Sequence, residues 1–250
     1  MTDLTCDEFL GGKLRLWQPK VGYRAGVDPL LLAASLPVQA GQTVLDIGCG
    51  IGTAGFAVMA RVSGVAVTGI EVQPLYAELA RRNVVETGLA LDVVEADFAS
   101  RPLQLRERSF DHVIANPPYF DRKASVAGPD GGRERAMGED TPLAAWVAYA
   151  AKRAKPKGYV TFIHRAERLP ELLAAMAENL GSLQALPLTP RTGRESQLVL
   201  VRGRKGGRAA FRLHAGLLVH EGPGHAGDRE NYTPLFQQVL KAGAALPFPA

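Results

Sequence analysis

The stretch that decides the fold is Val44-Leu45-Asp46-Ile47-Gly48-Cys49-Gly50-Ile51-Gly52, an apolar run that leads into alternating glycines. Dense apolar runs are typical of a strand that is covered on both faces of a parallel sheet. Glycines directly after such a strand let a ligand approach the backbone, and the following helix offers free N–H groups. The stretch therefore predicts a nucleotide-binding turn between a strand over 43–47 and a helix over 53–61.

Strand-like and helix-like runs alternate on both sides of this turn. Further strands are expected over 66–71, 91–95, 111–115 and 158–164, and helices over 28–36, 74–87, 141–155 and 167–180. The alternation predicts an α/β fold, a Rossmann-like, doubly wound and mostly parallel sheet of seven strands. The runs over 182–188, 197–202 and 211–220 predict an antiparallel hairpin at the C-terminal end. No repeat or linker divides the chain, so residues 1–250 are expected to form a single domain.

The second informative motif is Asn116-Pro117-Pro118-Tyr119, which directly follows the apolar run 110–115. An aromatic amine or an amide nitrogen is a weak nucleophile because its lone pair is delocalised, and acceptors around its N–H groups free that lone pair. The Asn116 side-chain carbonyl and the Pro117 main-chain carbonyl are such acceptors, held by fixed proline φ angles. Tyr119 offers a face for stacking a planar group. We therefore expect Asn116, Pro117 and Tyr119 to act in catalysis, mostly by placement and without a strong base.

Asp46 favours one class of cofactor over another. Gly50, Gly52 and Gly55 have the spacing of a dinucleotide site, with Glu71 suited to a ribose hydroxyl. A carboxylate at Asp46, however, repels a pyrophosphate and suits the cationic amino acid moiety of S-adenosylmethionine, which has no phosphates. Glu71 would then accept from both ribose hydroxyls and Asp97 from the adenine amino group, with Phe98 beside the ring. The cofactor-binding residues predicted in this way are Asp46, Gly48, Gly50, Glu71, Asp97, Phe98 and Asn116.

These motifs resemble the amino-methylating branch of the class I S-adenosylmethionine-dependent methyltransferases. Within it, the chain is most similar to the bacterial tRNA adenine N6-methyltransferases that modify the purine beside the anticodon. The likeness rests on the Asp46 turn, Asn116 to Phe120 and the flanking patterns Gln18-Pro19-Lys20-x-Gly22-Tyr23-Arg24-x-Gly26-x-Asp28, Glu71, Asn83, Val199 to Gly206, His220-Glu221 and Asn231-Tyr232-Thr233-Pro234.

The resemblance implies methyl transfer from S-adenosylmethionine to the exocyclic N6 amine of an adenine in tRNA. It implies that Tyr23, Arg24 and Asp28 close over the methionine end of the cofactor. It also assigns 1–40 to an N-terminal cap, 41–165 to the cofactor and catalytic core, and 166–250 to a C-terminal part with a basic hairpin.

Basic residues are locally in excess in that C-terminal part. Those predicted to contact RNA phosphates are Arg191, Arg194, Arg202, Arg204, Lys205 and Arg208. The net charge of +4 is compatible with a polyanionic partner, and a target base leaves its stack most easily in a single-stranded loop. The glycine-rich stretch 120–140 predicts a mobile loop that adds Arg122, Lys123, Arg133 and Arg135.

Other features narrow the class of protein. Two cysteines are too few for a disulfide framework, which favours a reducing, cytoplasmic setting. The N-terminus has no signal-peptide order, and no apolar stretch reaches the about 18 residues of a membrane span. The five histidines show no ligand spacing, so no metal is expected. The oligomeric state stays open, and a monomer is compatible with the sequence.

Three alternative functions also stay open. The turn over 116–119, which we call the catalytic turn, also suits N5-glutamine methylation of a protein substrate. The Gly50-Gly52-Gly55 spacing suits a dehydrogenase, and the basic residues suit a non-catalytic RNA-binding module.

Overall fold

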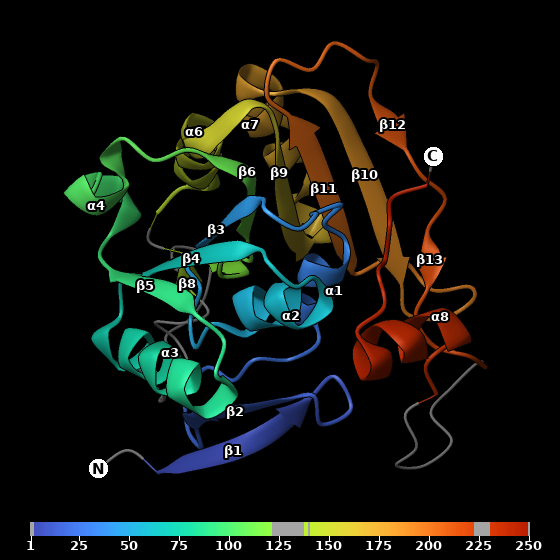
Figure 1. The fold of residues 1–250 in the computed structure, drawn as a ribbon. Coiled ribbons are helices and arrows are strands. Elements are labelled where there is room, and N and C mark those ends of the chain that lie inside the picture. The colour runs from blue at the N-terminus through green and yellow to red at the C-terminus, as the bar shows by residue number, and fades with distance from the viewer. Residues whose placement is uncertain (1–2, 122–137, 140, 223–230, 250) are drawn as a thin grey trace.

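The computed structural model describes residues 3–121, 138–139, 141–222 and 231–249. A sheet of nine strands crosses the molecule in the order β12-β10-β11-β9-β6-β3-β4-β5, with β13 beside β10 (Figure 1). Its parallel part consists of β3 (Thr43–Ile47), β4 (Ala66–Glu71), β5 (Leu91–Glu95), β6 (Phe110–Ala115) and β9 (Ala154–Arg165). Its antiparallel part is built on β10 (Gly181–Thr189) and β11 (Leu198–Arg204).

The predicted α/β class, the mostly parallel sheet and the C-terminal antiparallel hairpin are confirmed. Seven strands are long, and β12 (Arg212–Leu213) and β13 (Leu217–Leu218) add two short pairings to β10. The run 211–220 is therefore not the continuous strand that its apolar residues indicated, because its chain leaves β10 between the two pairings.

Helices cover both faces of the sheet, as Figure 1 shows. α1 (Asp28–Ala34), α2 (Thr53–Arg61) and α3 (Pro74–Thr87) contribute to one apolar core, and α6 (Leu143–Arg153) and α7 (Leu169–Asn179) to the other. Successive residues of a strand pack into opposite cores because side chains alternate between the two faces of the sheet. Val44 and Leu45 are an example. Two shorter helices are α4 (Leu103–Arg106) and α8 (Pro234–Gln237).

An N-terminal hairpin that the sequence did not predict packs beneath α3. Its strands are β1 (Leu4–Phe9) and β2 (Leu14–Pro19). The fully buried Asn83 of α3 attaches it: its Oδ1 accepts from the Trp17 amide at 2.7 Å, and its Nδ2 donates to the carbonyls of Trp17 and Ile51, each at 3.1 Å. The Asn83 side chain thus joins the hairpin, α3 and the turn over 48–52, which we call the glycine turn.

The order of the strands places a ligand site at one edge of the sheet. The chain proceeds outward from β3 through β4 to β5, and then returns to β6 on the other side of β3. In open α/β sheets, ligands bind at the carboxyl ends of the strands where this order reverses. The turn after β3 and the turn after β6 meet there, so the two sequence motifs become neighbours.

The segment after the catalytic turn is described only in part. β7 (Phe120–Asp121) and β8 (Gly138–Glu139) pair with each other. The predicted mobile loop, with Arg122, Lys123, Arg133 and Arg135, otherwise lies outside the described residues. Among the helices that the structure describes, none has the length and apolar character needed to cross a membrane.

Candidate active site

A cavity of about 870 Å³ opens at the carboxyl ends of β3, β4, β5 and β6. It is lined by all the residues predicted to bind the cofactor or to act in catalysis: Tyr23, Arg24, Asp28, Asp46, Gly48, Gly50, Glu71, Asp97, Phe98, Asn116, Pro117 and Tyr119. The structure therefore brings together residues that the sequence separates by almost a hundred positions. The cavity is within the size range of ligand pockets.

Asp46 presents an unusual acceptor to this cavity. Its side chain is 3% exposed, and its Oδ2 atom has no hydrogen-bond partner among the described residues. Burial raises the pKa of Asp46 to about 7; a backbone hydrogen bond from Gly55 lowers it and the Glu71 carboxylate raises it further. A buried acceptor without a donor is costly unless a ligand supplies one, so this position suits a cationic group.

The glycine turn is shaped to leave room for a ligand. Gly48 and Gly50 have φ angles of +68° and +55°, in the left-handed region that favours glycine. A Cβ on Gly48 would lie 2.8 Å from the Trp146 ring. Glu71 fixes the turn, since one carboxylate oxygen accepts from the Gly50 amide at 2.9 Å and the other from the Gln73 amide at 2.8 Å. Each oxygen keeps further acceptor capacity for a hydroxyl group.

An aromatic cluster closes one wall of the cavity. The Phe98 ring lies 4.6 Å from Trp146 and 5.3 Å from Tyr149, measured between ring centroids. The neighbouring Asp97 is exposed and uses Oδ1 to accept from the Ala99 amide at 2.8 Å. In the sequence, the helical spacing of Trp146 and Tyr149 is typical of residues in a core. Trp146 is buried, but it also lines the cavity, and helical spacing alone gave no sign of this second role.

The N-terminal segment closes the cavity from another side. The Tyr23 amide donates to the Tyr76 hydroxyl at 3.0 Å, which attaches this segment to α3. The Arg24 guanidinium pairs with Asp7 at 2.6 Å and also donates to Thr5 and to the Pro19 carbonyl. Arg24 therefore lines the cavity while its charged group is held by the N-terminal hairpin.

The catalytic turn presents a second unpartnered acceptor. Asn116 Oδ1 is buried and accepts no hydrogen bond from the part of the chain that the structure describes. The Tyr119 hydroxyl donates to Asp28 Oδ2, and its ring lies 5.5 Å from that of His164. Burial, together with the Asp28 charge, raises the pKa of Tyr119, so this group is a neutral donor and not a base. Sequence reasoning missed that Asp28 orients the Tyr119 ring.

Arg165, at the end of β9, is a second residue that sequence reasoning missed. Burial raises the pKa of Asp28, whereas the hydrogen bond from Tyr119 and the Arg165 charge lower it. Arg165 directly follows the predicted strand 158–164, so the rule that located Glu71 at a strand end would have found it.

The predicted RNA-binding residues do not form one surface. Arg191 is buried, and its Nη1 donates to the Glu221 and Gly222 carbonyls. Arg202 is half-buried, with its guanidinium carbon 4.2 Å from the Phe248 ring centroid. These two arginines hold elements of the fold together and lie apart from the exposed basic surface that the sequence indicated.

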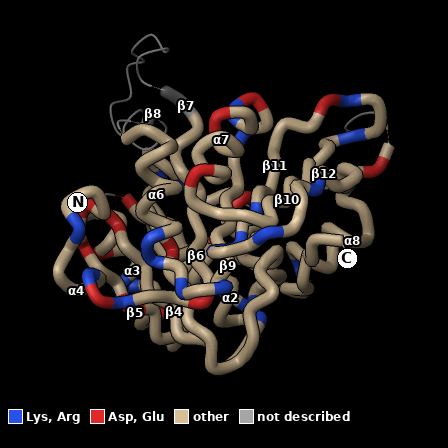
Figure 2. The backbone as a smooth tube through the Cα atoms, turned by 90° about the horizontal axis from the view of Figure 1, so that it is seen from above, with Lys and Arg blue, Asp and Glu red and all other residues tan. Residues whose placement is uncertain are grey.

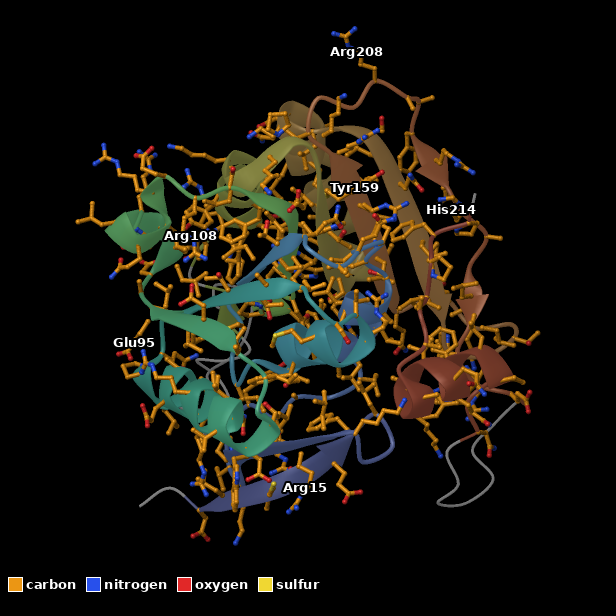
Figure 3. All side chains as sticks on the ribbon, viewed as in Figure 1. Arg15, Glu95, Arg108, Tyr159, Arg208 and His214 are labelled. Carbon is orange, nitrogen blue, oxygen red and sulfur yellow. The ribbon has the colours of Figure 1, made fainter. Side chains whose placement is uncertain are left out.

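The other basic residues separate toward opposite edges of the sheet. Arg204 pairs in register with Tyr159, and Tyr159 pairs in turn with His112. His112 precedes Asn116 by four residues. That is roughly 13 Å along the strand direction. Arg204 and Lys205 donate to main-chain carbonyls there, and Arg208 projects outward from the loop beyond (Figure 3). Arg194, in contrast, lies on the 190–197 turn at the catalytic edge. Lys and Arg positions are interspersed with Asp and Glu over several elements (Figure 2).

Comparisons with known proteins identify the class. Residues 24–128 match the methyltransferase small domain. A crystal structure described as a predicted O-methyltransferase of Agrobacterium tumefaciens superposes with a TM-score of 0.71 at 27% identity, over 89% of this chain and all of that one. A Thermus thermophilus 16S rRNA N2 G1207 methyltransferase, solved with its cofactor and guanosine, shares the fold with a TM-score of 0.58 at 17% identity, over 81% of this chain and 50% of that one.

The fold and the site thus define a class I S-adenosylmethionine-dependent methyltransferase. The tRNA1(Val) (adenine(37)-N6)-methyltransferase of Porphyromonas gingivalis is 30% identical over 213 residues, covering 82% of this chain and 80% of that protein. The enzyme of the same name from Cronobacter sakazakii is 30% identical, covering 69% of each chain. The chain belongs to the family of the tRNA1(Val) (adenine(37)-N6)-methyltransferases.

Proposed function

We propose that the protein transfers a methyl group from S-adenosylmethionine to the N6 amine of the adenine beside the anticodon in a tRNA. One observation carries this proposal: two buried acceptors without partners among the described residues, Asp46 Oδ2 and Asn116 Oδ1, line the same cavity. The first suits a cation and the second suits an N–H group. The names of the relatives support adenine in tRNA as the acceptor.

The cavity residues fit S-adenosylmethionine. Asp46 would hold the amino group, Glu71 the ribose hydroxyls and Asp97 the adenine amino group, with the ring beside Phe98. When bound, the cofactor supplies a methyl group on a positively charged sulfur. The dehydrogenase alternative fits less well, because the carboxylate of Asp46 lines this cavity and would repel a pyrophosphate. A Cβ on Gly52 would lie 2.6 Å from Phe56, so this glycine permits close packing inside the protein.

The catalytic turn would orient the target amine. Asn116 Oδ1 and the Pro117 carbonyl would accept from its two N–H groups, which weakens the delocalisation of the nitrogen lone pair. Tyr119, fixed by Asp28, would stack on the base. Burial lowers the pKa of His164 to about 4, so the nearby imidazole is neutral. Placement and hydrogen bonding thus supply the catalysis, and the proton leaves after the nitrogen has been alkylated. We further infer that residues 1–250 act as a single catalytic domain.

The test offers the purified protein undermodified total tRNA and total protein in parallel, each with radiolabelled S-adenosylmethionine. We expect label in tRNA that nucleoside analysis recovers as N6-methyladenosine. Label only in protein, recovered as N5-methylglutamine, would replace this function with the alternative acceptor. An absence of label in both fractions, in a protein that binds the cofactor, would refute the proposal.

A further inference from the structure

A second cavity, of about 1000 Å³, lies at the carboxyl ends of β9 and β10, and none of its lining residues lines the first cavity. The two are linked through Arg165, whose charge acts on Asp28. Its walls come from the end of β9 and from the turn between β10 and β11. The charged residues that line it are Arg165, Glu167, Arg191, Arg194 and Glu195. Three arginines and two glutamates therefore line the cavity, and the net charge of the lining favours an anion.

Sheet topology places this cavity beside the catalytic turn. β6 and β9 are parallel neighbours, and Ala115 pairs with Phe162, so Asn116 and Arg165 follow adjacent strand ends. β10 runs in the same direction as β9 because both are antiparallel to β11. The 190–197 turn thus stands at the same edge, about 10 to 15 Å across from β6 at the usual strand spacing. The first cavity lies over β3 to β5, on the other side of the catalytic turn.

The turn is held in place by its own contacts. The Thr189 and Ser196 hydroxyls are 2.8 Å apart, and the Arg194 amide donates to the Arg191 carbonyl at 3.1 Å. The Ala166 amide donates to the Gln197 carbonyl at 2.9 Å, which joins the turn to the end of β9. Arg191 attaches the turn to 221–222 by donating to the Glu221 and Gly222 carbonyls. The positions of the cavity walls are therefore defined before any ligand arrives.

Two guanidinium groups in this cavity remain available to a ligand. Arg194 is exposed and Arg165 is half-buried. Neither guanidinium group forms a hydrogen bond or an ion pair with another residue in the described ranges, although the Arg165 charge also acts on Asp28. Glu167 and Glu195 are exposed, so they can turn toward solvent. Arginine is well suited to phosphate because its planar donors bind two oxygens at once.

We propose that Arg165 and Arg194 bind an RNA backbone phosphate directly beside the target adenosine, so that the 190–197 turn seats the flanking nucleotide while the base enters the catalytic cavity. This inference rests on the proposed function, because it requires an RNA substrate. A base that leaves its stack must be held by its backbone, and a positively charged site beside the catalytic turn provides that hold. Arg204, Lys205 and Arg208 lie at the opposite edge and cannot reach the same phosphate.

The test measures steady-state methylation of full-length undermodified tRNA(Val) that carries one neutral methylphosphonate, placed in turn at each phosphate around the target adenosine. At one position, we expect the wild-type KM to rise about tenfold, as for the loss of a charge-assisted hydrogen bond. Arg194→Gln should raise KM by a similar factor on unmodified tRNA, with kcat and cofactor affinity retained. In the Arg194→Gln variant, the same methylphosphonate should then raise KM by less than a further twofold. Arg165→Gln is a second variant. It should also lose the methylphosphonate effect, but because the Arg165 charge acts on Asp28 we expect kcat to change as well.

Arg208→Gln is the matched control, because it removes one exposed charge at the other edge. It should retain the full tenfold effect of the methylphosphonate. If both Arg194→Gln and Arg165→Gln retain that effect at every position, the site does not bind a flanking phosphate. If inorganic phosphate inhibits methylation but KM does not depend on the position of the methylphosphonate, the site binds free anions and the inference is wrong. A wild-type enzyme that methylates no tRNA would instead refute the proposed function, which keeps the two failures distinct.

Discussion

The protonation of Asp46 should control cofactor affinity. The ionised carboxylate is the form that attracts a cation, and burial raises its pKa to about 7. Between pH 7 and pH 5.5, the ionised fraction in the free protein falls from about one half to about one thirtieth. The Kd for S-adenosylmethionine should therefore rise about fifteenfold over this range, since only the competent fraction binds. The sign follows from the raised pKa: affinity is gained as pH rises through 7.

Isothermal titration calorimetry measures both the affinity and the accompanying proton release. Asp46→Asn keeps the shape of the side chain and removes the charge, so we expect about 10- to 100-fold weaker binding and a flat profile from pH 5.5 to 7. Asp97→Asn is the control, because Asp97 lines the same cavity but is exposed. It should keep the wild-type pH dependence. A wild-type profile that is already flat, or an Asp46→Asn profile as steep as that of the wild type, would show that Asp46 does not control cofactor affinity.

Substitutions at three further positions test other parts of the structure. Asn83→Ala removes the three hydrogen bonds of a fully buried side chain, and urea unfolding should show a loss of about 2 to 4 kcal/mol. A loss below about 1 kcal/mol would contradict this role. Tyr119→Phe keeps the stacking face but leaves the Asp28 carboxylate without its donor, so kcat should fall about tenfold. Tyr119→Ala also removes the stacking face, so kcat should fall about a hundredfold. Equal losses of kcat in steady-state assays of the two variants would argue against stacking. Gly48→Ala places a Cβ against Trp146 and requires a left-handed alanine, which costs about 1 to 2 kcal/mol. Calorimetry should show weakened cofactor binding, and unchanged affinity would exclude a rigid turn.

Strand ends made much of the site predictable. In a parallel sheet, all carboxyl ends meet at one edge, so Asp46, Glu71, Asp97 and Asn116 could be grouped before any coordinates were known. The same rule applied to β9 would have added Arg165. The pattern of apolar runs also predicted the central strands closely, because buried strands carry a dense and unambiguous signal.

Other features depend on tertiary contacts that the local sequence does not encode. The basic run 191–208 reads as one cluster, but β11 separates its two ends by the length of a strand. Burial of Arg191 and Arg202 follows from packing against 221–222 and Phe248, which lie far along the chain. The N-terminal hairpin was missed because its strands carry fewer apolar residues than the buried central strands, and the contacts that attach it to α3 through Asn83 are tertiary.

We propose above all that the buried Asn116 side-chain carbonyl orients the target amine. Asn116→Ala removes that acceptor, and rapid-quench measurement of a single turnover, with cofactor bound and tRNA saturating, isolates the chemical step. We expect a rate about 100- to 1000-fold lower than in the wild type, as for the loss of one preorganised hydrogen-bonding group, with the affinities for cofactor and tRNA retained. A single-turnover rate equal to that of the wild type would contradict it.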